Sequence, residues 1–176
     1  ALMGDVHPQG NPHYWLDPLN GGIIAGRITD RLAILDPAGA DHYRENRRRF
    51  AAALAERMQR WQATMAPWRG QKIVTYHRSW NYFAARFGLT LAGEIEPKPG
   101  IPPGPVHLAE LERRIRAQKV ALIICEPFHN TGTARRVAER AGCRAVVLPS
   151  SVGGSPEAAD YLTLFDHIAG TLGNEF

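Results

Sequence analysis

The second half of the chain alternates short apolar runs with helical stretches, and this alternation constrains the fold more than any other feature. Strands are predicted at 72–76, 90–95, 120–125 and 145–148, and helices at 79–87, 107–118, 133–141 and 155–172. Strands that alternate with helices of this length are typical of right-handed crossover units. The wholly apolar run 121–124 fits a strand buried on both faces. We therefore predict an α/β fold with a mostly parallel sheet of about four strands, flanked by helices.

Two long helices are predicted before the sheet. Asp17-Pro18 and Asp36-Pro37 each place an N-cap residue before a proline at the first helical position. Apolar residues then recur at helical spacing in both segments. In the first helix they are Leu19, Ile23, Ile28, Leu32 and Leu35, and in the second Tyr43, Phe50, Leu54, Met58, Trp61 and Met65. The second stripe is interpreted as core packing, and Pro67 ends that helix.

Composition excludes several classes of protein. The chain has 176 residues, 44% hydrophobic and 22% charged, as in an ordinary globular domain. It is therefore neither a disordered chain nor a disulfide-stapled miniprotein. No apolar run reaches the roughly 18 residues that a membrane-spanning helix needs. A net charge of +4 is too small to indicate a nucleic-acid partner, and none is expected.

Polar side chains follow all four predicted strands. His77, Glu96, Glu126 and Ser150-Ser151 come after the first to the fourth strand in turn. In open parallel sheets, ligands bind beyond the carboxyl ends of the strands. A histidine and two carboxylates are therefore expected at one edge. A neutral imidazole there could bind a metal ion, act as a base or cap the following helix.

The other candidates leave alternatives open. His13 is held between a proline and an aromatic pair, which suits a ligand or a buried loop histidine, and His7 could reach the same ion or be exposed. Glu126 could bind a cation, accept a hydrogen bond from a ligating histidine or be satisfied by the following turn. Glu96 is predicted to anchor the proline-rich loop after it. The remaining histidines are interpreted as structural or solvated: His42, His107, His129 and His167.

The two cysteines are predicted to be free. Cys125 ends one parallel strand and Cys143 begins the next. Four to five residues of strand separate them by roughly 15 Å. A disulfide needs Cα atoms closer than ~7 Å. We therefore expect two mostly buried thiols and no thiolate metal site.

Catalytic and nucleotide-binding motifs are absent from the sequence. There is no dinucleotide-binding glycine motif, phosphate loop, nucleophile elbow or His-Glu-x-x-His. A zinc hydrolase using His13, His77 and Glu126 around a catalytic water is one alternative. It lacks an additional base and a glycine-rich oxyanion loop. A binding module for a non-metal solute, with structural histidines, is the other alternative.

Several segments, taken in order, resemble the C-terminal part of the metal receptors of ABC importers, the zinc and manganese cluster of periplasmic solute-binding proteins. Asn-Pro-His-Tyr-Trp-Leu-Asp-Pro at 11–18 is similar to the metal-histidine motif of that family. The segment 75–83 resembles its second-lobe histidine motif. Tyr-x-x-Asn at 43–46 and the segments 123–128 and 138–142 follow the same pattern.

The resemblance implies an organisation and a ligand set. It implies an interlobe loop and backbone helix at 1–36 and a C-terminal α/β lobe at 37–176, with the first lobe preceding this chain. His13 and His77 are then metal ligands, and Glu126 is predicted to join them. The aspartate that many members carry after the last strand is absent from 148–154. A set richer in histidine than in carboxylate favours Zn²⁺ over Mn²⁺.

The resemblance also implies a function without catalysis. Two lobes would close around Zn²⁺, and the receptor would deliver it to an ABC permease in the inner membrane. Such a receptor is periplasmic, or extracellular and membrane-associated. The helix 19–35 would lose part of its packing surface with the first lobe, so we expect a second copy of the chain to cover it as a homodimer.

Overall fold

A single sheet of four parallel strands forms the centre of the computed structural model, which describes residues 10–175. Its order is β2-β1-β3-β4. The strands are β1 (Lys72–Thr75), β2 (Thr90–Glu94), β3 (Leu122–Cys125) and β4 (Arg144–Val147). The predicted α/β class and parallel sheet are confirmed, with strand ends shifted by one or two residues.

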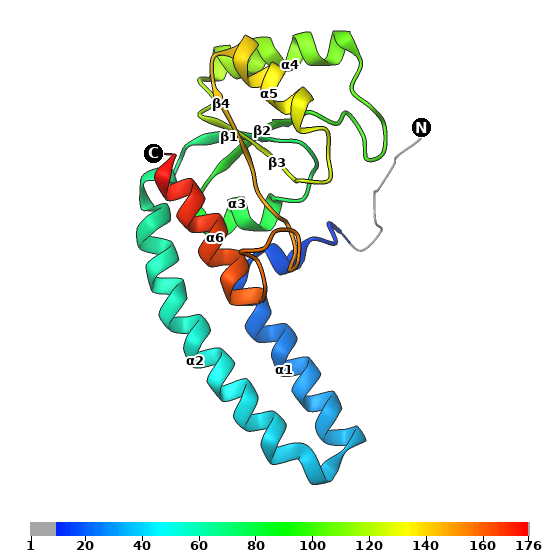
Figure 1. The fold of residues 1–176 in the computed structure, drawn as a ribbon, viewed down its shortest axis with the longest axis vertical. Helices are drawn as coiled ribbons and strands as arrows, with labels where there is room; N and C mark the ends of the chain where they lie inside the picture. The colour runs from blue at the N-terminus through cyan, green and yellow to red at the C-terminus, as the bar shows by residue number, and fades with distance from the viewer. Residues whose placement is uncertain (1–9, 176) are drawn as a thin grey trace.

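Helices cover both faces of this sheet (Figure 1). On one face α4 (Pro105–Gln118) and α5 (Thr131–Ala141) pack over Val74 and Ile123. On the other, α3 (Asn81–Phe87) and α6 (Tyr161–Asn174) pack over alternate strand residues such as Ile73 and Leu122. Because β3 lies in the middle with helices on both sides, all of its residues are buried.

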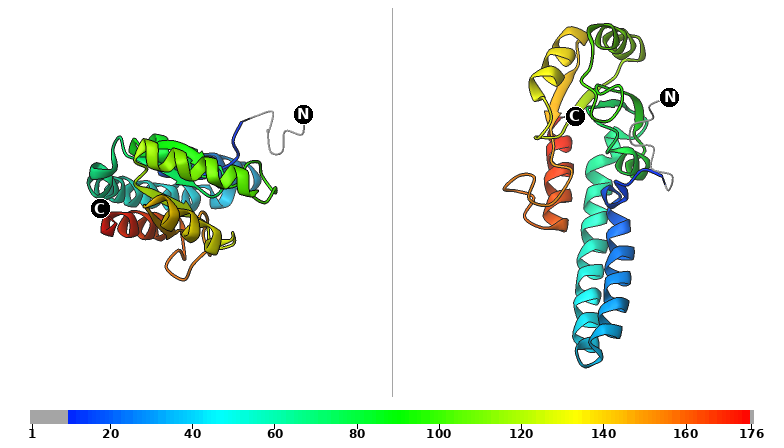
Figure 2. Two further views of the ribbon diagram at one scale, coloured as in Figure 1. Left: turned by 90° about the horizontal axis from the view of Figure 1, so that it is seen from above. Right: turned by 90° about the vertical axis from the view of Figure 1, so that its right-hand side faces the viewer.

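The first two helices form a long antiparallel hairpin that projects from the sheet region (Figures 1 and 2). They are α1 (Pro18–Leu35) and α2 (Ala40–Met65), with 3₁₀ turns η1 (Tyr14–Leu16), η2 (Pro37–Gly39) and η3 (Ala66–Trp68). Asp17 caps α1 as predicted, because its carboxylate accepts from Leu19 N–H. Asp36 accepts from Gly39 N–H and caps η2 instead, so α2 itself begins later than predicted, at Ala40. No helix among the described residues is long and apolar enough to span a membrane.

The end of α2 joins the core beside α6. Trp61 and Met65 are buried there, as the sequence predicts for the α2 stripe. The Trp61 indole N–H donates to Asp166 Oδ1 at 2.8 Å, and the Trp68 indole donates to the Leu172 carbonyl at 2.9 Å. These bonds tie the base of the hairpin to the last helix. The proposed division of the chain at 36/37 falls between two helices that pack together.

The helix predicted at 155–172 begins later than expected. Residues 155–160 form turns, and α6 starts at Tyr161. Ser155-Pro156 is thus a turn signal rather than a helix start. Asp160 is the N-cap because its carboxylate accepts from the N–H groups of Leu162 and Thr163, and Thr163 completes a capping box.

Candidate metal centre

His13 is fixed by the asparagine two residues before it. The Asn11 Oδ1 atom accepts from His13 N at 2.9 Å and lies 2.8 Å from His13 Nδ1. The Asn11 amide also donates to the Arg78 carbonyl at 2.7 Å, which ties this loop to the segment after β1. Since an amide oxygen only accepts, Nδ1 carries the proton and Nε2 holds the ring's lone pair.

His77 follows β1 and is held by a carboxylate that follows β2. His77 Nδ1 lies 2.6 Å from Glu96 Oε2. The second carboxylate oxygen of Glu96 accepts from Gly100 N–H at 2.5 Å. Glu96 therefore anchors the proline-rich loop, as predicted, and also orients His77. A carboxylate on Nδ1 fixes the tautomer and leaves Nε2 with the lone pair that a cation needs.

The fold brings the two predicted histidines together. Their ring centres are 5.3 Å apart. Two imidazoles on one tetrahedral zinc, with Zn–N about 2.0–2.1 Å, have ring centres about 5 Å apart. Both rings line a cavity of about 730 Å³, which Trp15 and Ser150 also line. The Trp15 indole donates to the Ser150 carbonyl at 2.8 Å, joining the loop before α1 to the loop after β4.

Glu126, the third predicted ligand, lies behind this cavity rather than in its wall. It is fully buried at the end of β3. Its Oε1 atom accepts from the Ser79 hydroxyl at 2.6 Å and from the Trp80 indole at 3.1 Å. Its Oε2 atom has no hydrogen-bond partner among the described residues. Burial raises the pKa of Glu126, and the Ser79 hydrogen bond acts in the opposite direction.

His129 lies in the cavity wall, although the sequence analysis interpreted it as structural or solvated. Its ring centre is 5.8 Å from that of His77, and its ring stacks on Tyr76 with centres 4.5 Å apart and planes at 13°. The Glu-x-x-His spacing just after a strand was the available signal. His7, which the sequence also left open, lies outside the described residues.

The described conformation does not contain a finished metal site. Within residues 10–175, no three His, Cys, Asp or Glu side chains are placed so that they could hold an ion together. His13 and His77 form a pair. A complete set needs either the movement of a further side chain or a donor beyond the described residues. Cys125 and Cys143 form no disulfide, as predicted.

The class of protein follows from fold comparison. The chain superposes with a TM-score of 0.81 on a solved structure described as the crystal structure of ZnuA, at 26% identity. The match covers 94% of this chain and 60% of that one. The fold is thus that of a large part of a two-lobed metal receptor, with the sheet and the hairpin both included.

The sequence comparisons give the family. The family described as zinc-uptake complex component A, periplasmic, matches residues 3–175, so the chain belongs to it. This is a family of solute-binding proteins rather than enzymes, which excludes the hydrolase alternative.

Curated relatives include two proteins described as high-affinity zinc uptake system protein ZnuA. The Brucella abortus (strain 2308) protein is 28% identical over 136 residues, 77% of this chain and 41% of that protein. The Yersinia pestis protein is 29% identical over 142 residues, 81% of this chain and 45% of that protein. The matched region thus spans less than half the length of either relative.

Proposed function

We propose that this chain is part of the zinc-binding component of an ABC importer, and that His13 and His77 bind the ion through Nε2. One observation carries the proposal: the ring centres of the two imidazoles lie 5.3 Å apart, and each ring has an oxygen partner at Nδ1. Both rings are thus oriented before an ion arrives, which lowers the cost of binding. Relatives described as zinc uptake proteins support the choice of metal.

Zinc is favoured over manganese by the donors themselves. Imidazole suits Zn²⁺, whereas carboxylate and water oxygens suit Mn²⁺. The two oriented donors are nitrogen atoms, and both nearby carboxylates already accept hydrogen bonds from the protein. Glu126 was predicted as a direct ligand. Its burial behind the cavity supports the role of an orienting carboxylate instead.

The cargo would be captured and handed on rather than transformed. In this proposal the ion is enclosed between this lobe and a second lobe, and an ABC permease in the inner membrane receives it. The receptor then works in the periplasm, or outside the cell at the membrane surface. Membership of a periplasmic zinc-uptake family supports this location and this partner. A homodimer through the exposed face of α1 is a separate part of the proposal.

A competition titration tests the function. The metal-stripped chain, His77→Ala and His13→Ala are titrated with Zn²⁺ and Mn²⁺ against a chromophoric chelator. We expect about one zinc per chain, tighter than manganese, with each variant weakened by more than the 10–100-fold typical of losing an outer partner. His42→Gln is the control, because His42 lies exposed on α2.

The outcomes separate the alternatives. Zinc binding that survives both alanine variants would place the ion elsewhere in the chain and make the two histidines structural. A wild-type chain that binds neither ion would remove the proposed function from this chain.

A further inference from the structure

Two histidines of the cavity share one arrangement. In His13 and His77, one ring nitrogen faces a protein oxygen at 2.8 and 2.6 Å respectively. This is the arrangement in which an oxygen behind the ring fixes the tautomer and turns the other nitrogen to the ion. A third histidine of the same cavity can therefore be compared with them.

His129 has an oxygen behind it as well. Its Nε2 atom lies 3.8 Å from Glu126 Oε2. Both atoms are buried, and neither has a hydrogen-bond partner among the described residues. Two unsatisfied polar atoms facing each other need an explanation, since burying a polar atom without a hydrogen-bond partner destabilises the folded chain. An approach of about 1 Å would bring them within hydrogen-bond distance.

Glu126 is held in place to receive this bond. Ser79 and Trp80 both donate to its Oε1 atom, which directs the remaining oxygen to His129. The residue is 0% exposed, so bulk solvent does not reach this oxygen. The His129 imidazole, with Nε2 at 3.8 Å, is a donor group that the structure places next to Oε2. Glu96 serves His77 in the same way from the neighbouring strand.

We propose that His129 is a third imidazole ligand of the same ion, with Glu126 as the carboxylate that orients it. In this arrangement Nε2–H donates to Glu126, and Nδ1 carries the lone pair that binds zinc. The inference rests on the proposed function and adds to it a ligand from this lobe. It also gives Glu126 the indirect role that its sequence position left open.

Ligation requires the His129 ring to move, because no three side chains in residues 10–175 are yet placed for an ion. The required movement is small, since the His77 and His129 ring centres are already 5.8 Å apart, against 5.3 Å for His13 and His77. The stack on Tyr76 allows it. Offset parallel rings keep their contact when one slides across the other.

The simpler alternative is that the His129 ring only packs in the cavity wall and binds no ion. The variant His129→Phe distinguishes this packing role from the proposed ligand role. Phenylalanine keeps a ring to stack on Tyr76 but has no nitrogen. We expect this variant to fold with an unchanged thermal midpoint and to bind zinc more weakly by more than the roughly 10–100-fold typical of losing an outer partner. X-ray absorption of the zinc-loaded protein should show one imidazole fewer than the wild type. An unchanged affinity and imidazole count would overturn the inference.

Glu126→Gln tests the pairing without removing any imidazole. The Trp80 indole only donates, so it holds the glutamine oxygen and turns the NH₂ group toward His129. Nε2 must then accept, the proton moves to Nδ1, and Nδ1 can no longer bind zinc. We expect a loss of about 10–100-fold, and the double variant with His129→Phe should bind zinc no more weakly than His129→Phe alone. Additive losses would overturn the pairing.

The controls keep this inference separate from the proposed function. His77→Ala must lose zinc and His42→Gln must keep it in the same titration. If they do and His129→Phe binds like the wild type, only the third-ligand inference fails. If His77→Ala also binds like the wild type, or the wild type binds no zinc, the proposed function fails and the inference fails with it.

Discussion

At the scale of single residues, burial near the cavity determines how reactive the two cysteine thiols are. Cys125 ends β3 just before Glu126 and is fully buried. Burial, with a smaller contribution from the adjacent Glu126 carboxylate, raises the pKa of the Cys125 thiol to about 12. Burial also raises the pKa of Cys143, which is partly exposed. The thiolate is the reactive form of cysteine, so both thiols should be slow nucleophiles in the folded chain.

This environment predicts selective alkylation. With iodoacetamide at about pH 8, we expect Cys143 to be labelled slowly and Cys125 to stay unmodified until the chain is unfolded. Mass spectrometry of tryptic peptides, with and without denaturant, measures both sites at once. In denaturant the two cysteines should react at similar rates, which serves as the control. Rapid labelling of Cys125 in the native chain would contradict its described burial.

The sequence indicated which side chains gather near the cavity, but not which side chains they pair with. The motifs around His13 and His77 indicated both, and the sheet-edge argument added Glu96 and Glu126. The partners depend on which strands are neighbours and in what register. Glu96 reaches His77 because β2 pairs with β1, whereas Glu126 faces His129 within one loop. His129 was missed because its one local signal, the closeness to Glu126 in the sequence, does not show whether the ring reaches a cavity.

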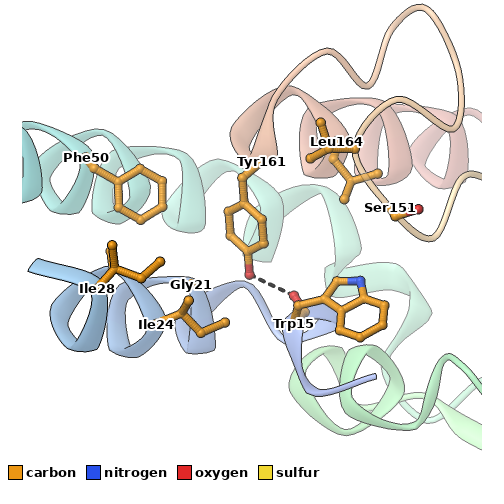
Figure 3. A pocket seen from close by; sticks show the side chains of 10 residues that line it. Trp15, Gly21, Ile24, Ile28, Phe50, Ser151, Tyr161 and Leu164 are labelled. Atoms are coloured by element: carbon orange, nitrogen blue, oxygen red, sulfur yellow. Dashed lines mark hydrogen bonds between the residues drawn. The ribbon is translucent and has the colours of Figure 1, made fainter. Parts of the chain in front are cut away.

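At the scale of elements, α1 packs through small residues. Gly26 and Thr29 are buried, whereas the larger Ile28 and Leu35 are 54% and 65% exposed. Beside its N-terminal turn, the Tyr161 hydroxyl donates to the Trp15 carbonyl at 2.7 Å (Figure 3). The Tyr161 ring lies against Gly21 so closely that a Cβ there would be 2.3 Å from it. Gly21 is thus required for the contact between α1 and α6.

Two neighbouring glycines make a matched test of this contact. Gly21→Ala should destabilise the chain by about 1–3 kcal/mol, because Tyr161 must give way in a packed region. Gly22→Ala should be neutral or stabilising by up to about 1 kcal/mol, because alanine favours the helix and its Cβ meets only Leu54 at an ordinary 3.6 Å. Urea unfolding followed by circular dichroism measures both. Equal changes in the free energy of unfolding for the two variants would show that the contact between Gly21 and Tyr161 does not limit packing.

Helix boundaries were predictable where a cap and a proline coincide. Asp17-Pro18 marked the start of α1 correctly, whereas Asp36-Pro37 starts the 3₁₀ turn η2 that leads into α2 at Ala40. The same reasoning failed at Ser155-Pro156, because the chain needs a further turn before Asp160 can cap α6. A local signal fixes where a helix can begin. The packing of Leu164, Phe165 and Ile168 into the core decides where it does begin.

At the scale of the whole molecule, the hairpin exposes apolar surface that the lobe does not use. A cavity of about 470 Å³ lies between α1, α2 and α6, with Ile24, Ile28 and Phe50 in its wall (Figure 3). Leu32 and Leu35 extend the exposed apolar surface along α1 and are 37% and 65% exposed. Such a stripe is larger than the scattered apolar residues usual on a monomer. The family resemblance predicted that this helix would present an uncovered face and that a second copy of the chain would cover it. The identity of the cover stays a prediction, because periodicity carries no information on partners.

The proposed homodimer makes a prediction about this stripe. If a second copy covers it, the chain should be a dimer at tens of micromolar concentration, and Ile28→Glu with Leu35→Glu should make it a monomer. Each glutamate would place an unpaired charge in the apolar contact, which costs several kcal/mol in a buried interface. Sedimentation velocity measures the mass of the wild-type chain and of the double variant, and Arg60→Glu on α2 is the control for added negative charge.

The substitutions lie away from His13 and His77, so zinc affinity should be unchanged. A wild-type chain that sediments as a monomer over this range would exclude the second copy and leave the stripe for another part of a longer receptor.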